Sequence, residues 1–430
     1  MNRLGPGLLA AALLLAGCDQ DGGAARQTGA NPPLPAPQRG LFTEMAVAEP
    51  GAWGNSRPTV PAGWRIAAIA TGLKVPRQVL VLPNGDLLIA EGKGGGQEPA
   101  LRPKDFVAKL VMKASTSSVA GGNRLTLLRD ADGDGVYEGR FVFAEGLNAP
   151  YGLALAGGRL FVANQDALVS FAYTPGQTRA AAPARLVTRL PAEINHHWTK
   201  SLTASADGRT LFVGIGSNSN IAERGMAVEE NRAMIWAVDA ATGGARPWAT
   251  GIRNPTALAI APGSGQLFAV ANERDELGPD LVPDYLTSVR EGAFYGWPYA
   301  YWGQHPDTRV QPFRNDMLAR AVAPDYALGS HVAPLGLAFS GPAMGARLAD
   351  GVFIGLHGSW NRARPAGYKV VFVAMAGGRP QGAPIDIVTG FQAGGKTLGR
   401  PAGVAVDPRG ALIVCDDLAN IIWRIVPAAS

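Results

Sequence analysis

The chain has 430 residues, of which 47% are hydrophobic and 17% charged, so it can bury a large core. Its 56 glycines and 33 prolines make up about a fifth of the residues and follow no collagen period, which favours many short strands joined by turns. The formal net charge of +5 comes from scattered arginines. Because there is no basic run, nucleic-acid binding is not expected, whereas anionic small molecules remain compatible with the charge.

The first 18 residues have the features of a bacterial lipoprotein signal peptide. Arg3 supplies a positive charge, residues 8–15 form an apolar run, and the sequence L-A-G-C ends at Cys18. The apolar run is too short for a permanent transmembrane helix. We expect Cys18 to be lipidated and to anchor a periplasmic protein to a bacterial membrane, the inner one if Asp19 acts as a retention signal. An ordinary secretory signal is the alternative.

The next segment, residues 19–62, is rich in proline, glycine and alanine, and we expect it to form a tether. The folded domain should then occupy residues 63–430. If Cys18 is lipidated, Cys415 is left alone, so no disulfide framework is expected.

One template recurs six times in this domain: an apolar alternation, a tight turn and a second apolar alternation. The copies open at Pro76, Pro150, Thr199, Pro255, Pro334 and Pro401, on average about 65 residues apart. Alternation with period two around a turn predicts a β-hairpin, and the interval leaves room for one or two further strands. The sequence therefore predicts an all-β protein, a six-bladed β-propeller.

The polar residues of the chain gather at two places in this repeat. In a propeller, residues just before the first strand and just after the second emerge together beside the channel. The residues before the first strands are Lys74, Asn148, His197, Arg253, Asn254, His331 and Arg400. Those after the second strands are Glu91, Asn164, Ser217, Asn218, residues 272–275, residues 357–362, Asp416 and Asp417. The register thus predicts a polar funnel at one end of the channel.

Three residues of this funnel suggest chemistry. His197 is the candidate general base, because an imidazole takes up a proton near neutral pH; a packing or hydrogen-bonding role is the alternative. Arg253 and Asn254 offer a cation and an amide to an anionic or carbonyl-bearing ligand, unless the arginine only pairs with a carboxylate of a neighbouring blade. Arg400, at the matching place in the sixth repeat, would complete a two-arginine clamp.

Two acidic loops are candidate calcium sites. The run N-E-R-D-E-L-G contains Glu273, Asp275 and Glu276, although the intervening arginine could neutralise them. The run D-A-D-G-D-G from Asp130 to Gly135 begins like an EF-hand loop, but Phe141 stands where a bidentate glutamate is needed, so a hairpin turn is at least as well supported.

These motifs together resemble the soluble quinoprotein sugar dehydrogenases. The resemblance rests on His197, G-I-R-N-P, N-E-R-D, F-Y-G-W-P, H-G-S-W-N-R and G-R-P-x-G-V-A-V-D, covers about residues 64–427, and is greatest for the sorbosone dehydrogenase branch. It implies a six-bladed propeller that binds pyrroloquinoline quinone (PQQ) and calcium. It further implies that His197 is the base, that Arg253, Asn254, Arg400, Trp360 and Asn361 contact the cofactor, and that Glu273, Asp275 and Glu276 lie at the calcium site.

The chain departs from the glucose-oxidising members of this family. Leu147 stands where they have a glutamine, Asn361 or Arg362 where they have a lysine, and Arg400 where they have two arginines. We expect oxidation of an aldose or aldehyde sugar with transfer of electrons to an external acceptor, since no haem motif is present. A calcium-dependent propeller hydrolase, such as a lactonase, and a membrane-tethered binding propeller are the alternatives.

Overall fold

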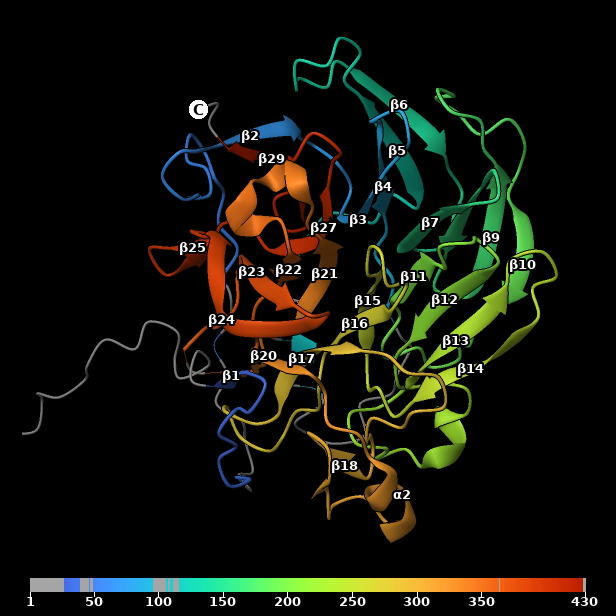
Figure 1. Ribbon diagram of the computed structural model, residues 1–430, viewed down its shortest axis with the longest axis vertical. Helices are drawn as coiled ribbons and strands as arrows, with labels where there is room; N and C mark the ends of the chain where they lie inside the picture. Colours follow the sequence, from blue (N-terminus) through green and yellow to red (C-terminus); the bar gives the residue numbers. More distant parts are fainter. Residues whose placement is uncertain are drawn as a thin grey trace, which may run out of the picture.

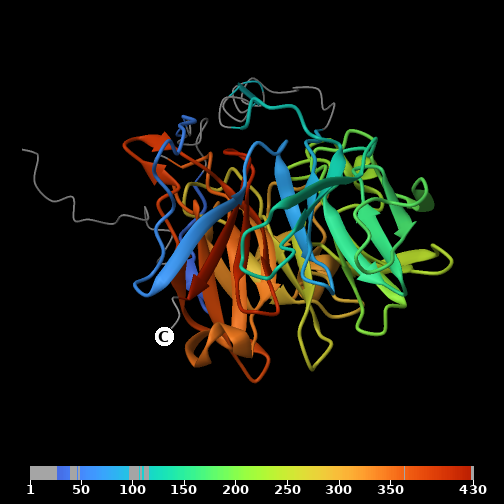
Figure 2. The same cartoon turned by 90° about the horizontal axis from the view of Figure 1, so that it is seen from above.

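The protein is a ring of six antiparallel sheets around a central axis (Figure 1). The computed structural model describes residues 27–38, 46, 49–95, 106, 109–110, 116–362 and 364–427. In the side view, the strands of the blades run between the two faces of the molecule (Figure 2). The predicted six-bladed β-propeller is confirmed.

Each blade contains four strands that follow one another from the axis to the rim. Blade I consists of β3 (Pro76–Val81), β4 (Leu87–Glu91), β5 (Arg124–Arg129) and β6 (Gly139–Ala144). Blade II consists of β7 (Gly152–Ala156), β8 (Arg159–Ala163), β9 (Ala167–Ala172) and β10 (Arg185–Arg189). Blade III consists of β11 (Lys200–Ala204), β12 (Thr210–Ile215), β13 (Met234–Asp239) and β14 (Ala245–Thr250).

The second half of the ring repeats this plan. Blade IV consists of β15 (Pro255–Ile260), β16 (Leu267–Ala271), β17 (Pro283–Ser288) and β20 (Tyr326–Ser330), with β1 (Thr28–Gly29) paired at its edge. Blade V consists of β21 (Pro334–Phe339), β22 (Gly351–Leu356), β23 (Lys369–Ala376) and β24 (Arg379–Val388). Blade VI consists of β27 (Pro401–Val406), β28 (Leu412–Asp416), β29 (Ile421–Pro427) and β2 (Trp64–Ala70), so the last sheet closes the ring with a strand from the start of the domain.

The six copies of the sequence template are the six axial hairpins. Their first strands, β3, β7, β11, β15, β21 and β27, each contact the next one around the ring. Both faces of a blade are buried because each packs against a neighbouring blade. In β4, for example, Leu88 and Ala90 pack toward blade II, whereas Leu87 and Ile89 pack toward blade VI. Six hydrophobic clusters of this kind fill the six interfaces between blades.

The axial channel encloses a cavity of about 380 Å³ lined by all six first strands. Hydrogen bonds between blades cross its lining. The Tyr151 hydroxyl lies 3.1 Å from Thr256 O and 3.3 Å from Leu335 O, while Gln78 Nε2 donates to Leu335 O over 2.8 Å. Since these groups belong to blades I, II, IV and V, side chains bridge the blades across the channel.

Parts of the segment expected to be a tether pack on the propeller. Thr28 and Gly29 pair with Leu328 and Ala327 of β20. Trp53 is buried against Phe391 and Trp423. A large aromatic ring can bury its surface even in a proline-rich context, which the composition of the segment did not indicate. The predicted signal peptide, with Cys18, lies outside the described residues.

Short elements lie outside the six sheets. The long connection between β17 and β20 contains β18 (Ala300–Tyr301), β19 (His305–Pro306) and α2 (Asn315–Arg320). Figure 1 shows β18 and α2 beyond the rim of blade IV, away from the axis. A two-stranded hairpin of β25 (Gln392–Ala393) and β26 (Lys396–Thr397) precedes β27. The other elements of the described residues are the single-turn helices η2 (Met226–Glu229), η3 (Pro342–Met344) and η4 (Ala346–Leu348). None of the helices in the described ranges is long and apolar enough to cross a bilayer.

Candidate functional site

Residues before the first strands and after the second strands meet at one end of the channel, which we call the mouth. Arg77 of blade I forms an ion pair with Asp417 of blade VI. The Arg77 guanidinium also lies 5.4 Å from the ring of Trp198, which precedes blade III. Asn361 of blade V donates to Asp275 of blade IV over 2.7 Å. These contacts join distant repeats at the end that the sequence register predicted.

The residues predicted for blades I and II contribute less to this site. Glu91 is fully buried and accepts hydrogen bonds from Arg124, 2.8 Å away, from Thr126 and from the Lys74 main chain. Asn148 accepts a hydrogen bond from Gln165 over 2.7 Å. Glu91 therefore stabilises its own blade rather than offering a free carboxylate to the mouth.

His197 lies in the connection between β10 and β11. Its Nδ1 lies 2.9 Å from Ser217 O and 3.0 Å from Ser217 Oγ. The Ser217 hydroxyl donates its proton to Ser219 O over 2.6 Å, so both oxygens near Nδ1 are acceptors. Nδ1 must therefore carry the ring hydrogen, and Nε2 is left with a free lone pair. Among the described residues, no hydrogen-bond partner occupies Nε2, as a base requires.

The surroundings of His197 disfavour its protonated form. Burial, followed by the positive charge of Arg253 and the neighbouring His196, lowers the pKa of His197 well below its usual value of 6.5. The His196 and His197 rings lie 4.5 Å apart in an edge-on arrangement. The imidazole is consequently neutral at physiological pH and ready to accept a proton.

Asn254 lies next to His197, on the other side of Gly216, which directly follows β12. A Cβ atom at Gly216 would lie 2.4 Å from Asn254 Oδ1 and 2.5 Å from the His197 Cβ. Asn254 Oδ1 is buried, and within the described ranges it has no hydrogen-bond partner. A buried acceptor of this kind normally has a partner, so it is a candidate ligand contact.

The Arg253 guanidinium is buried and held by several oxygens. It donates to Glu273 O over 2.7 Å, to Asn220 Oδ1 over 3.0 Å and to Asp275 Oδ2 over 3.3 Å. Arg253 does pair with a carboxylate, as the alternative in the sequence analysis held, but that carboxylate, Asp275, belongs to its own blade and not to a neighbouring one. These contacts fix the orientation of the cation at the mouth.

Asp275 is a carboxylate of the mouth that contacts several neighbouring side chains. Burial alone would raise its pKa, but its hydrogen bond with His331 and the charge of Arg253 outweigh that effect and lower the pKa to about 2. Its Oδ1 accepts from Asn361 Nδ2, and Asn220 Oδ1 accepts from its main-chain N–H over 2.9 Å. Asn361 Oδ1 is buried without a partner in the described part of the chain, as Asn254 Oδ1 is.

Arg400 lies on the other side of the mouth, beside the loop that carries Trp360. It donates to His357 O over 3.1 Å and to Gly358 O over 2.8 Å, and it lies 5.2 Å from the Tyr368 ring centre. Trp360 is half-buried in the same loop. Carbonyl oxygens thus hold both Arg400 and Arg253 in place, and a joint anion clamp between them stays a prediction.

The three carboxylates predicted at the calcium site have other partners. Burial raises the pKa of Glu273 to about 7, and Glu276 lies 3.8 Å from Arg309. Asp275 bonds Arg253 and Asn361 as described. A metal site built from side chains needs at least three acidic, His or Cys ligand atoms close together. Among the described residues, such a group within 4.8 Å occurs only at Asp130, Asp132, Asp134 and Glu138. Glu273, Asp275 and Glu276 therefore do not converge as side-chain ligands. Their role at a metal stays a prediction.

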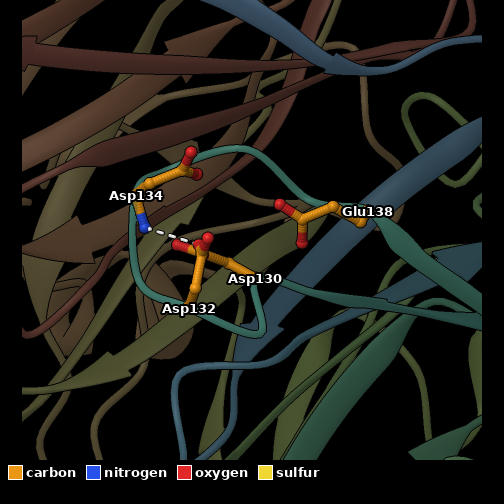
Figure 3. A group of neighbouring side chains, drawn as sticks. All are labelled: Asp130, Asp132, Asp134 and Glu138. Carbon is orange, nitrogen blue, oxygen red and sulfur yellow. Dashed lines mark hydrogen bonds between the residues drawn. The ribbon is translucent and has the colours of Figure 1, made fainter.

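The group that does converge is the loop between β5 and β6, with Asp130, Asp132, Asp134 and Glu138 (Figure 3). The loop is a hairpin turn and not an EF-hand loop, because Phe141, where the twelfth ligand would stand, already lies in β6 and pairs with Leu127 of β5. Glu138, which the EF-hand comparison did not consider, is the fourth carboxylate. Arg409 of blade VI donates to Asp130 over 2.9 Å, so the loop also makes a contact between blades.

Two residues of the mouth, Asn220 and Arg77, were not foreseen from the sequence. Asn220 bonds both Arg253 and Asp275, and its position in the run G-S-N-S-N after β12 was the available signal. His357 Nε2 lies 2.9 Å from Asp417 Oδ1, and Arg77 reaches the same carboxylate. Arg77 follows the proline of the first template copy, but nothing in the repeat indicates that it turns toward the mouth.

Comparison with known proteins gives a consistent family. A family model described as TrAA12-like matches residues 58–283 and 304–427. The chain is 24% identical over 359 residues to a pyrroloquinoline quinone-dependent pyranose dehydrogenase of Coprinopsis cinerea, an alignment that covers 73% of this chain and 44% of that protein. The chain spans about half the length of the curated relatives that it matches.

Solved structures share the fold. The holo form of the pyranose dehydrogenase PQQ domain from Coprinopsis cinerea has a TM-score of 0.68 and 21% identity, covering 86% of this chain and 97% of that one. A calcium structure of a Trichoderma reesei family AA12 enzyme has a TM-score of 0.69 and 21% identity, covering 89% of this chain and 99% of that one. At these identities the likeness concerns the fold. Because the family model matches well over half of the chain, the protein belongs to the TrAA12-like family.

Proposed function

We propose that this protein is a PQQ-dependent dehydrogenase that oxidises an aldose or aldehyde sugar. The observation that carries the proposal is His197, whose Nδ1 carries the hydrogen and whose Nε2 is left unprotonated beside the buried Arg253. The name of the relative from Coprinopsis cinerea and the holo structure of its PQQ domain support the choice of cofactor. The sorbosone branch indicated by the sequence motifs stays a prediction.

The residues of the mouth fit a flat, polyanionic cofactor. The guanidinium groups of Arg253 and Arg400 suit carboxylates, and the half-buried Trp360 offers an aromatic plane. The buried oxygens of Asn254 and Asn361, which have no hydrogen-bond partner in the described part of the chain, suit a hydrogen-bond donor or a cation. PQQ, when bound, supplies an electron-poor quinone that accepts the hydride of an alcohol carbon.

The protein residues would handle the proton and the orientation of the substrate. His197 Nε2 accepts the proton of the sugar hydroxyl as the carbon gives up its hydride, so the substrate loses two electrons and two protons to become a carbonyl. Arg253, fixed by Asn220 and Asp275, holds positive charge where negative charge develops. The electrons then pass to an external acceptor.

Calcium is part of the same proposal. The calcium structure of the Trichoderma reesei enzyme supports it. In the loop where calcium is expected, the main-chain oxygens of Glu273 and Asp275 already accept hydrogen bonds from Arg253 and Arg274, respectively. A cation bound here would therefore share these oxygens with the two arginines.

Substitution of His197 tests the proposal. His197→Gln should lower turnover by roughly 100- to 10,000-fold, the usual size of a general-base contribution, while PQQ binding persists. His305→Gln is the matched control, since His305 lies in β19 at the rim and stacks on Tyr301. Equal turnover in the two variants would show that His197 is not the base.

A calcium-dependent hydrolase is the second reading, and the mouth gives it less support. A metal cage of that kind needs carboxylates with free oxygens. Asp275 and Asp417 are both engaged, the first by Arg253 and Asn361 and the second by His357 and Arg77. Cleavage of a lactone by the calcium-loaded protein in the absence of PQQ would favour the hydrolase.

We also propose a periplasmic location with a lipid anchor on Cys18. The support is the lipoprotein box in the sequence. Cys18→Ser should move the protein from the membrane fraction to the soluble fraction, and retention of this variant in the membrane fraction would contradict the anchor.

A further inference from the structure

Two buried basic side chains lie beneath the turn that carries His197. Lys200, at the start of β11, is 0% exposed, and Arg232, just before β13, is 3% exposed. Neither forms an ion pair in the described part of the chain; Asp166 and Glu229 influence them only from a distance. Burying such groups without a carboxylate partner is costly, so their position calls for a physical reason.

Four of their six hydrogen bonds go to oxygens of residues 195–198, and the other two go to neighbouring main-chain oxygens. Arg232 donates to His197 O over 3.0 Å, to Gly216 O and Pro191 O over 2.9 Å each, and to Asn195 Oδ1 over 3.2 Å. Lys200 Nζ donates to the same Asn195 Oδ1 over 2.9 Å and to Trp198 O over 3.1 Å. The two buried side chains therefore hold residues 195–198 in place through these hydrogen bonds.

The turn needs this support because its backbone is strained. Ile194 and Asn195 have φ values of 61° and 52°, in the left-handed region. A β-branched residue such as isoleucine is strained in this region and is kept there only when its surroundings impose it. Hydrogen bonds from a charged guanidinium such as that of Arg232, whose pKa burial lowers only to about 10, are stronger than neutral ones and can supply that constraint.

We propose that Arg232 and Lys200 are positioning residues for His197, which fix the turn of residues 194–198 so that Nε2 faces the mouth. This inference rests on the proposed function for its catalytic meaning, but the positioning itself concerns the free protein.

Arg232 also contributes to the electrostatic setting of the histidine. The charged and titratable groups that face His197 are His196 on its own turn, Arg253 before β15 and Arg232 before β13. All three disfavour a second proton on the ring. Removal of Arg232 should therefore make His197 easier to protonate, whereas a lysine at this position would keep the charge and lose most of the carbonyl contacts.

Amide hydrogen exchange on the protein without quinone or sugar measures the positioning. In Lys200→Met and in Arg232→Lys, exchange at residues 195–198 should accelerate about tenfold or more, while exchange in the core strand β13 stays unchanged. Arg246→Met is the matched control, because it removes an exposed cation from β14 of the same blade. Unchanged exchange at the turn in both variants, or the same acceleration in β13, would overturn the proposal.

Titration of His197 by NMR gives a second readout. The chain has five histidines, so the His197 signal is the one missing from His197→Gln. The titration midpoint should rise by about one pH unit in Arg232→Met and stay near the wild-type value in Arg232→Lys and Arg246→Met. If Arg232→Met folds and the midpoint does not move, Arg232 does not influence the protonation of His197. If Arg232→Met does not fold, the exchange results for Lys200→Met and Arg232→Lys decide the proposal.

Neither experiment needs turnover, so a failed dehydrogenase assay leaves both results valid. If the dehydrogenase is active, kcat in Arg232→Lys and Lys200→Met should fall about tenfold or more with little change in KM. An unchanged kcat alongside a loosened turn would show that the positioning has no catalytic effect.

Discussion

Replacement of Tyr151 by phenylalanine would remove one hydroxyl group from the lining of the channel. The side chain is 1% exposed, and its hydroxyl lies 3.1 Å from Thr256 O and 3.3 Å from Leu335 O. Thr256 lies at a register shift in the pairing of β15 with β16. Leu335 O keeps its hydrogen bond from Gln78, so the substitution would chiefly deprive Thr256 O of a donor.

The expected loss follows from this contact. A buried carbonyl that loses its donor costs about 1–3 kcal/mol, so Tyr151→Phe should lower the free energy of unfolding by about 2 kcal/mol. For a domain of this size, that corresponds to a decrease in Tm of about 3 °C. Because the tyrosine links blade II to blades IV and V, the loss should appear as reduced stability of the whole ring.

Thermal unfolding of two matched variants measures this loss. Tyr285 is also 1% exposed, but its hydroxyl has no hydrogen-bond partner among the described residues, so Tyr285→Phe should be neutral or slightly stabilising. Tyr151→Phe should unfold at a clearly lower temperature than Tyr285→Phe. Equal Tm values would refute the idea that side-chain hydrogen bonds across the channel stabilise the ring.

Three further predictions concern the mouth and the N-terminal segment. Since the pKa of His197 is depressed below 6.5, kcat/KM should stay level from about pH 8 to 6.5 and decline only below; a decline already at about pH 7 would contradict that depression. Trp53→Ala should lower the free energy of unfolding by about 3–5 kcal/mol in denaturant titration, whereas a tether residue would have no effect. Gly216→Ala should reduce kcat about 100-fold by displacing His197 and Asn254, while Gly341→Ala, where the space around the Cβ is open, should leave kcat unchanged.

The sequence predicts the propeller well because each axial hairpin has a local pattern. Apolar alternation and a turn such as Asn84-Gly85 identify β3 and β4 without knowledge of their neighbours. The strand β1 and the burial of Trp53 depend instead on contacts with β20, Phe391 and Trp423, which are far away along the chain. Composition in a short window carries no information on such contacts.

The sequence predicted the position of the site, but not the side-chain contacts that join its residues. The repeat register brings His197, Arg253 and Arg400 to one end of the channel, as expected. It does not show that Asn220 holds Arg253, or that Arg232 lies beneath His197, because those pairs join different loops through specific side-chain directions. Glu138 was missed for a related reason, since the spacing of an EF-hand loop was applied to a hairpin.

Reconstitution with PQQ and calcium tests the central claim most directly. Protein lacking residues 1–18 would be mixed with both, and quinone absorbance and dye reduction would be followed with aldoses, sorbosone and lactones. We predict uptake of one quinone per chain and dye reduction that depends on a sugar; in His197→Gln the uptake should persist while the reduction falls by roughly 100-fold or more. The absence of quinone uptake, or full dye reduction by His197→Gln, would contradict the proposed dehydrogenase.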